Sequence, residues 1–334
     1  MGMLHPMARR RLLRGVLYAL LAVFLGLVVL GVGIGLSLNS KYAKRWPATA
    51  AFFQGIAIQL LVGRIPEHTV LPSLVYGTRQ GDPLVIEPIR PAQTNGLGVL
   101  LLVSGSWKSS TNSTRPWIIT PLLRRGYTVF AVCHVSQPKA TIMEIIADMQ
   151  RAVRHVRHHA REFGIDPNRL GVTGGSAGGH LSLMLATRGG PGNPAAADPI
   201  DRESSAVQAV AIFYPVTDLL NLGTSTENLG DGGPPRSFVQ AFGPGATNRT
   251  LWKDIGRDTS PIYHIRSNLP PTLIYHGDAD TLVPLDQSQR YQADAVKSGN
   301  LVSLIVHPGG GHGWPTMVWD IEHFARWFDE HLRR

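Results

Sequence analysis

The segment Gly174-Gly175-Ser176-Ala177-Gly178 constrains this chain more than any other, because it predicts a sharp turn between two apolar elements. Residues 169–173 before it are typical of a short buried strand, and residues 180–186 after it are typical of an apolar helix. A serine between two glycines at a strand-to-helix turn is the G-x-S-x-G pattern, in which the serine takes a strained backbone conformation that requires small neighbours. The pattern predicts that the Ser176 hydroxyl stands above the edge of a sheet.

An acidic residue and a histidine follow Ser176 in the order that such a serine requires. A serine hydroxyl is a weak nucleophile at neutral pH and needs a base, which itself needs an orienting acid. Asp280 follows the apolar stretch 271–276, and His312 follows the apolar stretch 301–306. Both residues therefore lie just past the end of a predicted strand, at the edge where ligands bind in open α/β sheets.

These segments carry a resemblance to a known family. From about Ser73 to the C-terminus the chain resembles an α/β-hydrolase of the esterase/lipase group, which includes hormone-sensitive-lipase-like and feruloyl-esterase-like enzymes. It is also similar to the catalytic domain of prolyl oligopeptidases. The resemblance implies that Ser176 is the nucleophile, Asp280 the acid and His312 the general base, with no cofactor and no metal. The segments that carry it are Asp166–His180, Tyr214–Asp218, His276–Pro284 and Gly311–Gly313.

The expected oxyanion-hole segment departs from the pattern of this family. Its members carry His-Gly-Gly-Gly after the third strand, often followed by Trp, whereas the predicted strand 98–103 here precedes Ser104-Gly105-Ser106-Trp107. By the resemblance, Gly105 and Ser106 take the donor positions, and the amide of Ala177, the residue after the nucleophile, is the other donor. The hole needs backbone N–H groups rather than the histidine, so the change is compatible with activity.

Two polar residues near these motifs need separate interpretation. The H-G-x-x-D-x-x-V-P pattern favours Asp280 over Asp278 as the acid, which leaves Asp278 a structural role in its turn. His134 follows the predicted strand 127–133, where many relatives have a Tyr-Arg pair. We interpret His134 as a hydrogen-bonded histidine at a strand end rather than as a catalytic one.

Strand and helix patterns alternate along residues 73–334, as they do in successive βαβ units. The alternation predicts a mostly parallel sheet of eight strands flanked by helices, the last of them over residues 317–332, and the resemblance implies that this is an α/β-hydrolase fold. Residues 217–260 are rich in Gly and Pro and predict a small, loop-rich cap. The strands are expected near residues 73–77, 83–89, 98–103, 127–133, 169–173, 207–213, 272–275 and 302–307.

An uncharged apolar stretch, Val16–Leu38, precedes the predicted hydrolase domain. At about 1.5 Å per residue it is long enough to span a hydrocarbon core of roughly 30 Å. A cleaved signal peptide is the alternative, but its apolar core is shorter, roughly 7–15 residues. We therefore expect a cytoplasmic basic leader over residues 1–15, a transmembrane anchor over 16–38, and a linker over 39–72 that contains an interfacial helix. The Gly31-Val-Gly-Ile-Gly35 sequence favours a weak homodimer.

Positive charge is concentrated beside this apolar stretch. The whole chain carries a net charge of +9, but residues 1–66 hold eight Lys or Arg and no Asp or Glu. The remaining 24 basic and 23 acidic side chains nearly balance, which argues against a nucleic-acid partner and favours contact with anionic lipid. Four arginines precede the stretch and three basic residues closely follow it. We expect a single-pass protein of the inner (cytoplasmic) membrane with its hydrolase domain outside the cytoplasm.

The sequence as a whole predicts a membrane-anchored serine hydrolase that cleaves carboxylic esters through a Ser-His-Asp triad and an acyl-enzyme intermediate. One alternative is a prolyl-oligopeptidase-like peptidase, although too few residues precede Ser73 to form the β-propeller of that family. The other is a non-catalytic binding protein with a hydrolase fold, which the altered oxyanion segment leaves open. The expected substrate is a small-molecule or polysaccharide ester.

Overall fold

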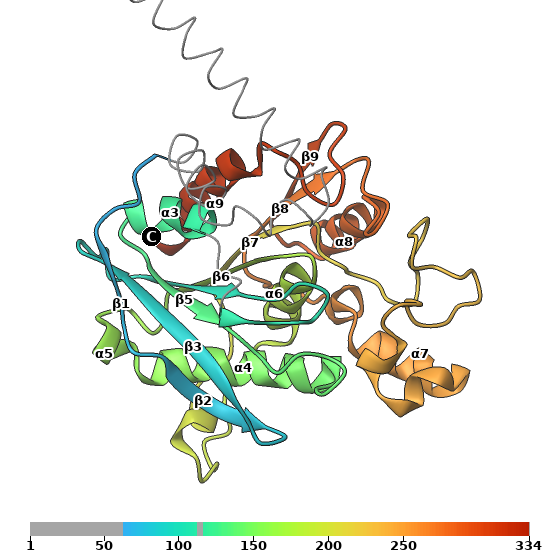
Figure 1. The fold of residues 1–334 in the computed structure, drawn as a ribbon, viewed down its shortest axis with the longest axis horizontal. Coiled ribbons are helices and arrows are strands. Elements are labelled where there is room, and N and C mark those ends of the chain that lie inside the picture. The colour runs from blue at the N-terminus through green and yellow to red at the C-terminus, as the bar shows by residue number, and fades with distance from the viewer. Residues whose placement is uncertain (1–62, 112–115, 334) are drawn as a thin grey trace, which may run out of the picture. The chain divides into compact units, whose positions relative to one another are not determined.

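A nine-stranded sheet organises the part of the chain that the computed structural model describes, residues 63–111 and 116–333 (Figure 1). The strand order is β1-β3-β5-β4-β6-β7-β8-β9, and β2 also pairs with β3. The strands β4 to β9 run parallel, while β3 is antiparallel to β1, β2 and β5. The strands are β1 (His68–Val70), β2 (Leu74–Arg79), β3 (Asp82–Pro91), β4 (Gly98–Leu102), β5 (Thr128–Val132), β6 (Leu170–Gly175), β7 (Ala209–Phe213), β8 (Thr272–Gly277) and β9 (Val302–His307).

The predicted mostly parallel α/β sheet is confirmed, with one strand more than expected. The additional strand is β1, whose three residues are all exposed and carry no alternating apolar pattern. Every residue of the central strands β4, β5 and β7 is buried, as is typical of parallel strands covered by helices on both faces. These strands were therefore predictable from their continuous apolar runs.

Helices cover both faces of the sheet, and the sheet separates the core into two layers (Figure 1). Side chains of α4 and α6 fill one layer, and side chains of α3 and α9 fill the other. The helix α4 begins with a capping box between Thr141 and Glu144. The helices are α3 (Pro116–Arg124), α4 (Ile142–His158), α5 (Ala160–Phe163), α6 (Ala177–Arg188), α7 (Arg249–Asp258), α8 (Asp286–Lys297) and α9 (Met317–Leu332).

Residues 217–260 follow β7, as expected for a cap, and they are rich in loops. They are also better packed than their composition suggests. Phe242 and Trp252 are buried with ring centroids 5.0 Å apart, and Trp252 lies on α7, a helix that the sequence analysis did not predict. The backbone N–H of Leu219 donates to the Ser260 hydroxyl at 2.8 Å, which ties the two ends of the segment together.

The predicted leader, the transmembrane anchor and all of the linker up to residue 62 lie outside the described residues. Within the described part of the chain, no helix is both long enough and apolar enough to cross a bilayer. Residues 65–334 form one compact unit, which begins somewhat before the expected start of the hydrolase domain at Ser73.

Candidate active site

Ser176 occupies the turn between β6 and α6 in a backbone conformation that few non-glycine residues adopt. Its φ is 55° and its ψ is −118°. Such a conformation persists only where the surrounding packing enforces it. A Cβ atom on Gly174 would lie 2.6 Å from the Gly178 carbonyl carbon, and one on Gly178 would lie 2.6 Å from the Leu102 carbonyl oxygen. The turn therefore requires glycine on both sides of the serine, as the sequence pattern predicts.

The structure brings Ser176, His312 and Asp280 into one hydrogen-bonded chain. His312 Nδ1 lies 2.7 Å from Asp280 Oδ2, and His312 Nε2 lies 2.9 Å from Ser176 Oγ. Because a carboxylate only accepts hydrogen bonds, Nδ1 carries the proton and Nε2 accepts from the serine hydroxyl. Asp280 lies on the loop after β8 and His312 on the loop after β9, so both meet Ser176 at the carboxyl edge of the sheet.

Asp280 is buried, and its surroundings favour the charged form. Its Oδ1 accepts hydrogen bonds from the backbone N–H groups of Leu282 at 3.0 Å and Val283 at 2.9 Å. Although burial raises the pKa of the Asp280 carboxyl, polar contacts with His276 and His312 and the Val283 N–H hold that pKa well below its usual range. Asp280 therefore stays ionised and is able to stabilise an imidazolium at His312.

Asp278 is exposed and accepts the backbone N–H of Gly309 at 2.6 Å. This bond joins the loop after β8 to the loop after β9. The structure thus places Asp278 in the turn and Asp280 beside the histidine, in agreement with the expectation from the motif.

The turn after β4 requires a correction to the predicted oxyanion hole. The Gly105 N–H donates to the Lys108 carbonyl at 3.0 Å, and the Lys108 N–H returns a bond to Gly105 at 2.9 Å. Gly105 is therefore not available as an oxyanion donor. Ser106 and Trp107 take positive φ values of 52° and 53° within this turn. The amides of Ser106, Trp107 and Ala177 donate no hydrogen bond to the described residues, so each of them is able to donate one to an acceptor on a ligand.

His134 forms a hydrogen bond with Ser104, in the turn after β4. Its Nδ1 lies 2.9 Å from the Val135 carbonyl and its Nε2 lies 2.9 Å from Ser104 Oγ, so the Ser104 hydroxyl donates to Nε2. Burial lowers the pKa of His134, which keeps the ring neutral. Ser104 and His134 are both departures from the family's sequence pattern, and here they contact each other. The sequence analysis did not predict this hydrogen bond between Ser104 and His134.

A second buried histidine, His180, ties the same turn to the cap. The Trp107 Nε1–H donates to His180 Nδ1 at 3.1 Å, and His180 Nε2–H donates to the Thr259 carbonyl at 2.7 Å. Burial lowers the pKa of His180 to about 4, so the imidazole is neutral at physiological pH. Among the described residues, no group of three or more His, Cys, Asp or Glu is arranged to hold a metal ion.

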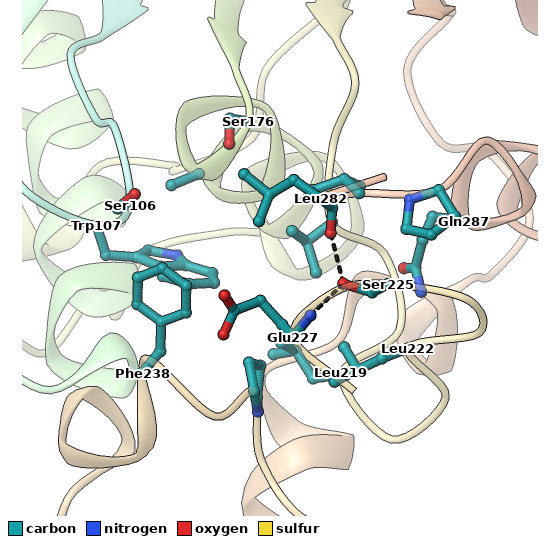
Figure 2. A pocket seen from close by; sticks show the side chains of 15 residues that line it. Ser106, Trp107, Ser176, Leu219, Leu222, Ser225, Glu227, Phe238, Leu282 and Gln287 are labelled. Atoms are coloured by element: carbon teal, nitrogen blue, oxygen red, sulfur yellow. Dashed lines mark hydrogen bonds between the residues drawn. The ribbon is translucent and has the colours of Figure 1, made fainter. Parts of the chain in front are cut away.

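Two cavities meet at Ser176. The smaller has a volume of about 40 Å³, and the larger has a volume of about 640 Å³. His312 lines only the larger of these two cavities. Figure 2 shows the smaller one, whose walls include Trp107, Leu219, Leu222, Phe238 and Leu282.

Comparisons with known proteins show the family of this chain. The BD-FAE family model matches residues 89–294. Esterase LipQ of Mycobacterium tuberculosis is 30% identical over 217 residues, covering 63% of this chain and 48% of LipQ. Ethyl acetate hydrolase of Pseudomonas putida is 28% identical over 308 residues, covering 89% of this chain and 91% of that enzyme.

A truncated carbohydrate esterase from gut microbiota has a similar fold, with a TM-score of 0.64 and 24% identity. That match covers 81% of this chain and 100% of the solved structure. The chain spans about half the length of the first curated relatives it matches, with 48%, 42% and 60% of their lengths covered.

The neutral state of His180 predicts how stability depends on pH. Its pKa of about 4 in the folded protein lies below the value of about 6.5 for an unfolded histidine, so its contribution is complete above pH 6.5. That contribution is lost as the pH falls toward 4, and about 2 kcal/mol should be gone by pH 5. Urea unfolding at pH 7.5 and pH 5 should show this loss in the wild type.

The variant His180→Gln cannot take up the proton and should lose about 2 kcal/mol less than the wild type over the same interval. An identical pH dependence in the two proteins would contradict a buried neutral His180.

Proposed function

We propose that this chain, which belongs to the BD-FAE family, is a carboxylic ester hydrolase that uses Ser176, His312 and Asp280 as a catalytic triad. The observation that carries the proposal is the hydrogen-bonded chain from the Ser176 hydroxyl through His312 to the buried Asp280 carboxylate. Its location where two cavities meet adds support. The named activities of the relatives, which include an ethyl acetate hydrolase and an acetylxylan esterase, support it further.

The geometry suits a two-step acyl transfer. Ser176 Oγ attacks the ester carbonyl while His312 Nε2 takes its proton, and Asp280 stabilises the imidazolium that forms. The carbonyl oxygen becomes an oxyanion and accepts hydrogen bonds from the backbone N–H of Ala177 and from that of Ser106 or Trp107. The C–O bond to the alcohol then breaks, His312 returns the proton to the leaving alkoxide, and an acyl-enzyme remains. His312 next deprotonates water, which attacks the acyl carbon. The bond from that carbon to Ser176 Oγ breaks, His312 returns the proton to Oγ, and the acid leaves.

The two cavities have different roles in this mechanism. The leaving alcohol receives its proton from His312 and must lie beside that residue, which lines the larger cavity of about 640 Å³. The acyl group then occupies the smaller cavity of about 40 Å³. We therefore propose esters of short acids with bulky alcohols as substrates, including acetylated carbohydrates.

We also propose that Val16–Leu38 anchors the enzyme in the cytoplasmic membrane and that the hydrolase domain lies outside the cytoplasm. The length of this apolar stretch and the basic clusters that flank it support the proposal. Pairing of two anchors through Gly31 and Gly35 belongs to the same proposal.

Substitutions in the triad should abolish ester hydrolysis without unfolding the protein. Ser176→Ala should lower kcat by about 10⁴ to 10⁶, and Asp280→Asn by about 10⁴, when short p-nitrophenyl esters are the substrates. Asp278→Asn is the matched control, because it changes an exposed carboxylate on the same loop, and it should retain activity within a few-fold. Equal turnover by Ser176→Ala and the wild type would overturn the proposed function.

The anchor predicts a defined proteolytic fragment. Protease added to cells with a permeabilised outer membrane should digest the hydrolase domain and leave a short fragment in the membrane. An immunoblot for an N-terminal tag would detect that fragment. Complete protection until the inner membrane is broken would reverse the orientation, and a mature N-terminus near Ser40 would show cleavage of the segment instead.

A further inference from the structure

One carboxylate lies among the apolar walls of the smaller cavity. Glu227 lines this cavity together with Ser176, Trp107 and Phe238. Figure 2 shows its carboxylate directed into the space beside the rings of Trp107 and Phe238. The side chain is half-buried, and it extends from the cap, on a segment that the catalytic mechanism does not use.

Ser237 holds this carboxylate through two hydrogen bonds. The backbone N–H of Ser237 donates to Glu227 Oε2 at 2.8 Å, and the Ser237 hydroxyl donates to Oε1 at 3.1 Å. The segment that carries Glu227 is also attached to the loop after Asp280. The Thr226 N–H donates to the Thr281 carbonyl at 2.9 Å, and the Ser225 hydroxyl donates to the Leu282 carbonyl at 2.6 Å. Glu227 is thus positioned relative to the triad through its backbone.

The carboxylate retains capacity to bind another donor. A carboxylate has about four lone-pair sites, and the two bonds from Ser237 use only two of them. Among the ion pairs formed by the described residues, none includes Glu227. A charged acceptor on the wall of an otherwise apolar cavity attracts a hydrogen-bond donor and repels an anion.

We propose that Glu227 is a specificity residue that favours acyl groups bearing a hydrogen-bond donor, either a hydroxyl or an ammonium. The inference rests on the proposed function, and in particular on the assignment of the smaller cavity to the acyl group. It predicts preference for hydroxyacyl or aminoacyl esters over alkyl esters of equal size, and discrimination against acyl groups with a second carboxylate.

The test compares ethyl esters that have equal numbers of heavy atoms. Ethyl propionate, ethyl glycolate and ethyl glycinate differ only in a terminal methyl, hydroxyl or ammonium, and ethyl butyrate with ethyl 3-hydroxypropionate extends the comparison by one carbon. The measured quantity is the kcat/KM of the donor-bearing ester divided by that of its alkyl counterpart. Comparing this ratio between the wild type and the variants cancels the intrinsic reactivity of each ester.

Glu227→Gln should lower this ratio about tenfold or more for at least one of these pairs, as expected for loss of a charge-assisted bond. Glu162→Gln, which removes an exposed carboxylate on α5, is the control and should leave the ratio unchanged. Ser237→Ala keeps Glu227 and the backbone N–H bond to its Oε2 but removes the hydroxyl bond to its Oε1, so it should lower the ratio by a smaller factor. This second variant tests the proposal even where Glu227→Gln folds poorly.

Unchanged ratios in both Glu227→Gln and Ser237→Ala would overturn the inference. So would a change confined to the alcohol side, measured with 2-hydroxyethyl acetate against propyl acetate. Absence of ester hydrolysis in the wild type and in Glu162→Gln would instead refute the proposed function, so the two failures are distinguishable.

Discussion

The close approach of the Gly174 and Gly178 backbones is the contact on which the rest of the site depends. A Cβ atom at either position would come within 2.6 Å of backbone atoms, so only glycine permits the chain to turn this sharply from β6 into α6. The turn sets the strained conformation of Ser176 and leaves the Ala177 amide unpaired among the described residues. It also places the Gly178 N–H 3.1 Å from the Ser104 carbonyl, which joins the nucleophile to the oxyanion segment.

Buried neutral histidines support this arrangement from outside the triad. His134 accepts from Ser104, and His180 links Trp107 to Thr259 near the cap. Each ring has both nitrogens engaged, so substituting either histidine would leave buried partners unsatisfied at a cost of about 1–3 kcal/mol per group. In the proposed mechanism such supports keep the amide donors in position before the substrate arrives, and preorganised donors contribute strongly to oxyanion stabilisation.

The sequence predicted the central strands because both of their faces are buried. It indicated Ser176, Asp280 and His312, which the structure joins by hydrogen bonds, because their order and their places after predicted strands are those of the proposed triad. It could not establish the oxyanion donors. Which of the amides of Gly105, Ser106 and Trp107 is free depends on the positive φ values of Ser106 and Trp107, which their identities do not reveal. The partners of His134 and His180 are distant in the chain and leave no local pattern.

Covalent labelling of the nucleophile tests the central claim most directly. The purified protein would be treated with a p-nitrophenyl phosphonate ester, and the adduct located by peptide mass spectrometry while the remaining activity is followed. The account predicts one adduct per chain, at Ser176, with activity lost in proportion to labelling and no labelling in His312→Ala on the same timescale. An adduct at another serine, or full ester hydrolysis by protein fully labelled at Ser176, would contradict it.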